Sequence, residues 1–429
     1  MVSRRPYHAM KTFFHSILNP IRTLNRPARL FLLALFLDGL LFSGWSLFFN
    51  LYIISAGYSR DFLGLINAAP SLSALLLGVP MGFLSDRMGR KPAMLVGFTL
   101  ANFAIIGMVL VHVESWMVVL ALIWGAVGQL YFLSQAPFMM KTSDDKSRDM
   151  LFSLSFGMVP LANTLGNFMA GYLPRAMSQL FGLITEASAY RMVLLFSALI
   201  SFLVLVPIAF IREPKSAGDQ LRTKTREPKP SIWKTLLRPL TLKLSLPNLA
   251  IGFGAATLIP YLNVFFSTRF HLTDSALGYL FGVGSLATGL GCIIGPRLIP
   301  NLGGKVRLIT LGQSVSLVFL LMVGFSPWPW LAVIGFVVRG ALMNMVSPLM
   351  DAFALEQSHE SEHGAVTSIR NFAWNIGWTV GPYVSGLVQQ RWGFTPLFIN
   401  TAVMYGIGIS LTWIFFRPRP APEPAIAPV

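Results

Sequence analysis

Twelve runs of about 20 apolar residues follow one another along this 429-residue chain, and they constrain its fold more than any other feature. An α-helix of that length crosses the hydrocarbon core of a bilayer. Apolar residues make up 54% of the chain and the runs use most of them, so little is left for a soluble catalytic domain. The runs cover residues 31–55, 62–85, 92–112, 115–139, 150–174, 191–211, 244–268, 275–296, 307–326, 329–351, 365–389 and 394–416.

Charged residues are scarce, at 12% of the chain against about 25% in soluble proteins. So few charges could not cover the surface of a soluble protein of this size. We therefore expect an all-α membrane protein with twelve transmembrane helices. The single cysteine, Cys292, excludes an internal disulfide and a Cys-based zinc site, and its apolar surroundings favour a buried small side chain.

The net charge of +16 would suit a nucleic-acid partner, because clustered Lys and Arg bind phosphate. However, 26 of the 33 cationic residues lie in the two tails and in alternate loops. The positive-inside rule then places both termini in the cytoplasm of a multi-pass cell-membrane protein. These cations can contact anionic lipid heads, so we expect membrane lipids and no nucleic acid as partners.

The longest polar stretch, residues 212–243, divides the runs six and six as a cytoplasmic linker. The expected halves are residues 30–211 and 244–416, between tails at 1–29 and 417–429. We expect no cleavable signal peptide in the first tail, and its apolar residues at helical spacing allow either a short interfacial helix or a disordered basic segment. Alternating Pro and Ala predict disorder in the second tail.

The two halves also repeat each other in sequence. A shift of 214 places residues 84–91 on 298–305, and a shift of 215 places residues 166–171 on 381–386. Two matches at nearly one offset, in corresponding spans, indicate a duplication. Two pseudo-symmetric six-helix halves follow from it.

The loop after the second run reads Gly82-Phe83-Leu84-Ser85-Asp86-Arg87-Met88-Gly89-Arg90-Lys91. It resembles the signature loop of the major facilitator superfamily (MFS), G-x-L-(A/S)-D-(R/K)-x-G-R-(R/K), and every defining position is present. With the six-and-six division, the resemblance extends over the whole chain. It implies a transporter that moves small solutes or lipids by rocking its two halves about a central site lined by spans 1, 4, 7 and 10.

The resemblance also implies a conformational latch between the halves in this loop. Physically, Gly82 permits close helix contact, Gly89 allows a sharp turn, and Asp86 can accept hydrogen bonds from neighbouring cations. Positive-inside bias alone would explain Arg87, Arg90 and Lys91, but not the acid and the glycines. In the second half Pro300 stands where the acid would be, so a symmetric second latch is not expected.

Three charges lie inside spans, where an ionised group is costly unless it has a partner or faces a cavity. Asp38, in span 1, is the candidate proton or cation carrier, with an Asp held by hydroxyls such as Ser43 or by a lysine as the structural alternative. Arg339, in span 10, is a candidate for an anionic substrate group or for pairing with Asp38. Arg370, in span 11, is expected to pair with Asp351 or Glu356.

Amides and amphipathic rings along spans 4, 5, 7, 10 and 11 are candidates either for substrate contact or for bonds between helices. They are Gln129, Tyr131, Asn163, Tyr261, Asn263, Asn344, Asn371, Trp374, Asn375 and Trp378. A stretch of span 11 with Gly377, Gly381, Pro382 and Gly386 resembles the antiporter motif of the family, which belongs on span 5. Small residues four apart also explain it as helix packing, so the direction of transport stays open.

The segment His359-Glu360-Ser361-Glu362-His363 matches H-E-x-x-H, but it lies in a short loop and no third ligand follows, so we expect a polar loop without metal. A P-loop is absent from the sequence. We predict a monomeric secondary transporter without enzymatic activity or cofactor, driven by a proton or other ion gradient. Export of an amphipathic or drug-like compound is favoured. The alternatives are uptake of a sugar or organic anion, and a transporter-like membrane sensor.

Overall fold

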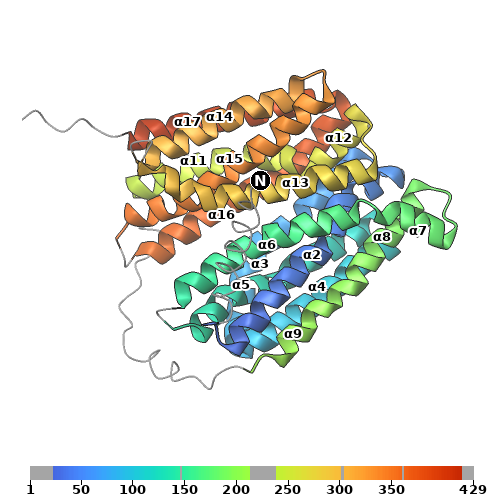
Figure 1. Ribbon diagram of the computed structural model, residues 1–429, viewed down its shortest axis with the longest axis horizontal. Helices are drawn as coiled ribbons and strands as arrows, with labels where there is room; N and C mark the ends of the chain where they lie inside the picture. Colours follow the sequence, from blue (N-terminus) through green and yellow to red (C-terminus); the bar gives the residue numbers. More distant parts are fainter. Residues whose placement is uncertain (1–22, 145–146, 213–237, 301–303, 360–361, 418–429) are drawn as a thin grey trace, which may run out of the picture.

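The computed structural model describes residues 23–144, 147–212, 238–300, 304–359 and 362–417. Most of the N-terminal tail, for which an interfacial helix and a disordered segment were both expected alternatives, lies outside these ranges, as do most of the linker and most of the C-terminal tail. Within them the chain is helical and contains no strand. The helices form two bundles, one from each half of the sequence, which lie one above the other in Figure 1.

Six membrane-length segments make up the N-terminal half, and a short helix, α7 (Leu173–Phe181), follows the fifth. The segments are α2 (Arg26–Ser55), α3 (Arg60–Met88), α4 (Arg90–Leu110), α5 (Glu114–Thr142), α6 (Arg148–Ala170) and α8 (Glu186–Ser201) continued by α9 (Leu205–Phe210). Asn25 caps α2 and Ser59 caps α3, each accepting a hydrogen bond from a first-turn backbone N–H.

The C-terminal half repeats this plan. Its six segments are α11 (Pro239–Leu258) continued by α12 (Leu262–Phe270), α13 (Asp274–Leu298), α14 (Lys305–Phe325), α15 (Pro329–Glu356), α16 (His363–Trp392) and α17 (Thr395–Phe416). In the described part of the chain the twelve predicted spans are therefore all present as helices.

Ten of these twelve segments are long and apolar enough to cross a membrane by hydropathy, and α6 and α16 are the two that are not. Both pack between the halves, α6 against α13 and α16 against α3. A helix that contacts protein on several sides can carry more polar residues than one that faces lipid.

The bundle has two ends, which we name from the chain. The tail end is where α2 begins and α17 ends, and the hairpin end is where α2 meets α3 and α16 meets α17. Exposed tryptophans gather at the hairpin end, as expected where helices leave the hydrocarbon. Four of the five exposed tryptophans in the described ranges lie there, Trp116, Trp328, Trp330 and Trp392, and the fifth, Trp413, lies near the tail end.

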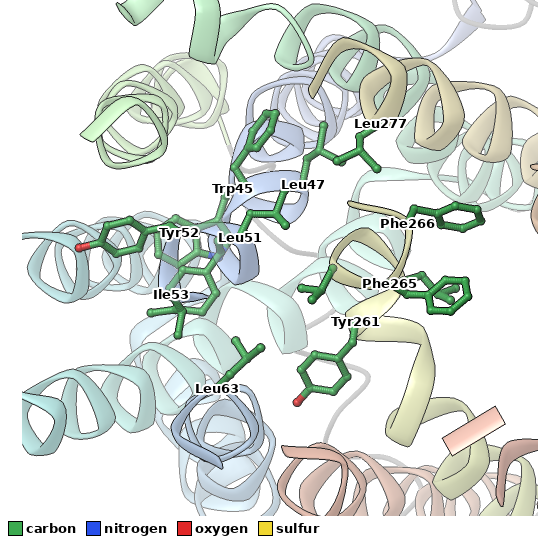
Figure 2. Packing of buried hydrophobic residues seen from close by; sticks show 14 of the residues in the cluster. Trp45, Leu47, Leu51, Tyr52, Ile53, Leu63, Tyr261, Phe265, Phe266 and Leu277 are labelled. Carbon is green, nitrogen blue, oxygen red and sulfur yellow. The ribbon is translucent and has the colours of Figure 1, made fainter. Parts of the chain in front are cut away.

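The two halves share one hydrophobic core near the hairpin end. Figure 2 shows Leu51 of α2 and Leu63 of α3 on the side that faces Tyr261 and Phe265 of the other half. Towards the tail end the core divides in two, and each part belongs to one half.

Cross-half hydrogen bonds also lie towards the hairpin end. The seventh span breaks at Pro260, between α11 and α12, and the carbonyl of this proline accepts from the Asn50 amide of α2 at 2.6 Å. Asn263 donates to the Leu47 carbonyl at 2.8 Å, and Tyr190 donates to Asp274 at 2.8 Å. The halves are therefore joined at the hairpin end.

Glycines let the halves approach closely at two symmetry-related points. A Cβ on Gly64 would lie 2.6 Å from the Pro382 oxygen, and Gly64 faces Gly386. Gly171 faces Gly278 in the same way, with 2.9 Å from a Cβ on Gly171 to the Cα of Gly278. Gly64 and Gly278 are 214 residues apart, so the sequence repeat corresponds to a structural one.

Candidate functional site

A cavity of about 330 Å³ lies inside the C-terminal half, between α11, α14, α15, α16 and α17. On α16, Arg370, Trp374 and Trp378 line it at intervals of four residues, which places them on one helical face. On α15, Arg339 and Asp351 also line it. Two guanidinium groups and two indole rings thus share one space.

The local sequence makes room for these side chains. Gly252 of α11 lies directly against the Trp374 ring, and a Cβ there would lie 2.9 Å from its Cε3 atom. The rings of Trp374 and Trp378 lie 6.2 Å apart at 32°. Asn248 donates to the Arg370 carbonyl at 2.9 Å and so ties α11 to α16 at the cavity wall.

Arg339 is buried, and within the described part of the chain its side chain and carbonyl make hydrogen bonds to its own half. Its Nη2 donates to the Tyr405 hydroxyl at 2.9 Å, and its backbone carbonyl accepts from Ser316 at 3.2 Å. Within the described ranges no carboxylate lies within ion-pair distance of this guanidinium. The pairing with Asp38 that the sequence allowed is absent, because the two residues line different cavities.

Arg370 has the partner expected from the sequence. Its Nη1 donates to Asp351 at 3.0 Å. The Arg370 side chain is 7% exposed and the Asp351 side chain 72%, so the pair connects a buried cation to a carboxylate at the solvent-exposed rim. The other expected partner, Glu356, instead pairs with Lys305.

Several buried polar atoms around this cavity have no hydrogen-bond partner. They are Nε of Arg339, Nε of Arg370, Nε1 of Trp378 and Oε1 of Gln313. Buried polar groups are normally paired, so such a cluster of three donors and one acceptor needs an explanation.

A second cavity, of about 210 Å³, lies inside the N-terminal half between α2, α4, α5 and α8. Asp38 lines it, and Tyr131 donates to the Asp38 carboxylate at 3.5 Å, which is long for an O–H···O bond. The hydroxyl suggested by the sequence, Ser43, instead donates to the Gly39 carbonyl. In the described part of the chain no lysine or arginine lies within ion-pair distance of Asp38.

A third cavity, of about 240 Å³, lies between the halves and is lined by α6, α12, α13, α15 and Ile259 of the turn between α11 and α12. Asn163 of α6 faces it, together with Arg339 and Asn344. Since both these residues of α15 also line the larger cavity of the C-terminal half, the two spaces adjoin.

The remaining candidates separate into three groups. Asn371 and Trp374 line the cavity of the C-terminal half, whereas Asn263 is buried in the contact between the halves. Gln129 and Asn375 are not among the residues that line these three cavities.

Among the lining residues of the cavity of the C-terminal half that sequence reasoning missed are Asn248, Gln313 and Tyr405. Gln313 and Tyr405 belong to spans 9 and 12, outside the cavity-lining set of spans 1, 4, 7 and 10. An uncharged polar group within a span was the available signal, because such a group is costly when it faces lipid.

The signature loop makes contacts within the N-terminal half. Arg90 forms an ion pair with Asp86 and donates to Ser85 at 3.0 Å. Lys91 donates to the Ala209 and Ile211 carbonyls at the end of α9. Gly89 has φ of 89°, which a glycine tolerates best.

The close contact expected at Gly82 is absent, since a Cβ there would meet only the Leu133 side chain, at 3.7 Å. The glycines of span 11 do pack closely. Gly377 and Gly381 lie against α11 in the same half, and Gly386 lies against α3 in the other half. Pro382 accepts a hydrogen bond from Tyr261 through its carbonyl.

The H-E-x-x-H segment is only partly described, because residues 360 and 361 lie outside the described ranges. Glu362 pairs with Arg238, and His363 begins α16. Among the described residues, no group of three or more His, Cys, Asp or Glu side chains could hold a metal ion.

Comparison with known proteins gives one consistent result. The family model described as Major Facilitator Superfamily matches residues 31–314 and 302–429. The multi-drug resistance efflux pump PmrA of Streptococcus pneumoniae is 23% identical over 362 residues, covering 83% of this chain and 86% of that protein. The multidrug resistance protein MdtG of Proteus mirabilis is 25% identical, covering 78% of this chain and 81% of that protein.

Solved structures share the fold at low identity. The nucleoside transporter NupG superimposes with a TM-score of 0.68 at 16% identity, covering 91% of this chain and 99% of that chain. A bacterial homologue of the human lysosomal transporter Spinster, in an inward-facing and occupied conformation, gives 0.69 at 13% identity, covering 96% and 97%.

Proposed function

Because this chain belongs to the major facilitator superfamily, as a multi-pass membrane transporter, we propose that it exports an amphipathic small molecule in exchange for protons. The proposed role is transport and not catalysis. We propose that a monomer carries it out, because each half of one chain contains its own cavity. Distant similarity to two multidrug efflux proteins supports export.

The proposed site of proton coupling is Asp38, and its environment is the observation that carries the proposal. This carboxylate lies within a membrane-spanning helix and lines a cavity, and its described hydrogen bond is a long one from a neutral tyrosine hydroxyl. A carboxylate held by a cation would stay ionised. One without such a partner can take up a proton when the cavity dries and release it when water enters.

The distribution of cations supports a plasma-membrane orientation with both termini in the cytoplasm. The tail end of the bundle is then the cytoplasmic end. Since the halves are joined at the hairpin end, the described conformation would be open towards the cytoplasm, where an exporter collects its substrate.

The alternative of organic-anion uptake is favoured by one observation, the two arginines in the cavity of the C-terminal half. Export and uptake differ in the gradient they need. An antiporter accumulates substrate on the side that protons leave, because substrate and protons move in opposite directions. A symporter accumulates substrate on the side that protons enter, because the two move together.

The test is flux in proteoliposomes with an imposed pH gradient, using fluorescent amphipathic compounds of three charge types: ethidium, N-phenyl-1-naphthylamine and 2-naphthoate. We expect gradient-driven antiport of at least one compound. The Asp38→Asn variant should lose it by about tenfold or more, as expected when a coupling group is removed. The exposed carboxylate variant Glu114→Gln is the matched control and should transport normally.

Binding of a compound without gradient-driven movement of any of them would contradict the proposal and favour a sensor. Undiminished coupling in Asp38→Asn would remove this residue as the proton carrier. Accumulation only in the direction of proton entry would indicate uptake.

A further inference from the structure

We propose that the cavity of the C-terminal half is an anion site for amphipathic organic acids, in which the positive charges of Arg339 and Arg370 attract the acid group and Trp374 and Trp378 contact the apolar part. This inference rests on the proposed transport function, and it specifies the chemical class of the substrate.

The first argument is charge. Three charged side chains line the cavity, and two of them are guanidinium groups that stay protonated. The single carboxylate, Asp351, is 72% exposed, so water screens much of its charge. Arg339 is not close to any carboxylate in the described ranges. The cavity is thus net positive, and it would repel a cationic compound.

The second argument is unfilled hydrogen-bonding capacity. Each guanidinium carries five N–H donors. Arg339 uses Nη2 on Tyr405 and Arg370 uses Nη1 on Asp351, but Nε of each is buried without an acceptor. The indole N–H of Trp378 is also buried and unpaired. A carboxylate, sulfonate or phosphate would bring several acceptors to a wall that has a surplus of donors.

The third argument is the shape and lining of the rest of the space. Trp374 lies one helical turn from Arg370 and Trp378 one turn further along α16, and the two indole rings are 6.2 Å apart. Indole faces bind flat apolar groups. A volume of about 330 Å³ is at the small end of the range for small-molecule sites. An acid on a one- or two-ring skeleton fits this description, whereas a neutral sugar would leave both arginines without an anion.

The test is equilibrium binding of 2-naphthoate to the full chain in detergent, by calorimetry, with the neutral amide 2-naphthamide as the charge control. We expect the acid to bind about tenfold or more tightly than the amide, as charge-assisted hydrogen bonds predict. Arg339→Gln and Arg370→Gln should each weaken 2-naphthoate binding by about tenfold, and leave 2-naphthamide binding nearly unchanged.

Matched variants separate the site from general effects. Arg391→Gln changes an exposed arginine at the far end of α16 and should bind as the unaltered chain does. Arg339→Lys keeps the charge without the planar fork and should be intermediate. Asp351→Asn removes the carboxylate at the rim, and should tighten 2-naphthoate binding by about twofold. The expected result for Asp351→Asn is a gain in 2-naphthoate affinity, which misfolding could not produce.

Equal affinities for the acid and the amide would overturn the proposal, as would equal effects of Arg391→Gln and Arg370→Gln. Binding in nanodiscs with and without phosphatidylglycerol distinguishes a soluble acid from a lipid headgroup as the anion. Unchanged 2-naphthoate affinity supports a soluble acid. Weaker 2-naphthoate binding in the presence of this lipid would overturn the proposal, because the site would then bind a headgroup. If the anion site fails while Asp38-dependent ethidium export persists, the proposed function stands. If 2-naphthoate binds through the arginines but no compound moves, the transport proposal fails.

Discussion

The two halves of this protein share a backbone framework, yet their cavities carry opposite charge. The cavity of the N-terminal half contains the carboxylate of Asp38, and that of the C-terminal half contains the guanidinium groups of Arg339 and Arg370. At the offset of 214 residues, Asp38 corresponds to Gly252 and Arg339 corresponds to Gly125. Neither charge has a charged counterpart.

The glycines at the contact between the halves, by contrast, are kept in both copies. Gly64 corresponds to Gly278, and at an offset of 215 Gly171 corresponds to Gly386. Close backbone approach leaves no room for a side chain, so these positions are constrained by the fold. A cavity-lining position has open space before it and can change its chemistry after duplication.

The largest expected effect comes from breaking the shared framework. A leucine in place of Gly386 would collide with the Arg60 carbonyl, which lies 2.5 Å from a Cβ at this position. Overpacking of this kind costs about 1–3 kcal/mol. It would therefore lower, by about tenfold or more, the population of the conformation in which the hairpin end is closed. Transport in proteoliposomes should fall accordingly.

Gly171→Leu should have an effect of the same size, since it meets Gly278 in the equivalent contact. Gly406→Leu is the control, because nothing lies within 4 Å of a Cβ there. If only one of the two contact variants reduced transport, the framework would not be functionally symmetric.

A smaller effect is expected where the contact between the halves is itself asymmetric. Tyr190 donates to Asp274 across the halves at 2.8 Å, and the residue corresponding to Asp274 is Arg60, whose backbone N–H donates to the Gln390 side chain. Tyr190→Phe removes one hydrogen bond, which contributes about 0.5–1.5 kcal/mol to the contact between the halves. A change of this size should alter the transport rate by about threefold. Stopped-flow measurement of initial rates would resolve this.

Tyr172→Phe, which removes a solvent-exposed bond to Tyr279, is the comparison and should change the rate less. A larger effect of Tyr172→Phe than of Tyr190→Phe would show that burial does not determine the strength of these bonds.

The smallest expected effect lies in the signature loop, which the second half does not reproduce. Asp86→Asn removes the ion pair with Arg90, in which both side chains are partly exposed, and such pairs contribute about 0.2–1 kcal/mol. We expect the turnover rate to fall by about twofold. Lys305→Gln in the matching loop removes a comparable ion pair with Glu356 and should reduce the turnover rate less, and an equal loss there would contradict a role specific to the first half.

Much of the fold could be predicted from the sequence, because membrane insertion is a property of each segment. The spans 150–174 and 365–389 correspond to α6 and α16, although their polar residues lower their hydropathy. The close approach expected at Gly82 was wrong, since the distance between two helices depends on both surfaces.

The candidate site was only partly predictable. Arg339, Arg370 and Trp374 stand out as polar or charged groups within spans, and the structure brings them to one cavity. Gln313 and Tyr405 were missed because their spans were taken to be peripheral, and the face that a helix turns inward is set by its neighbours. For the same reason the sequence could not separate Asp38 and Arg339 into different cavities.

The central claim is that the two halves divide the work, with Asp38 coupling transport to protons and the arginines binding the substrate. The most direct measurement compares Asp38→Asn with Arg370→Gln in the same proteoliposomes, for 2-naphthoate affinity and for its pH-driven accumulation. We predict that Asp38→Asn keeps its affinity within about twofold but loses accumulation, while Arg370→Gln loses about tenfold in affinity. If Asp38→Asn lost affinity as strongly as Arg370→Gln, the division of work between the halves would be contradicted.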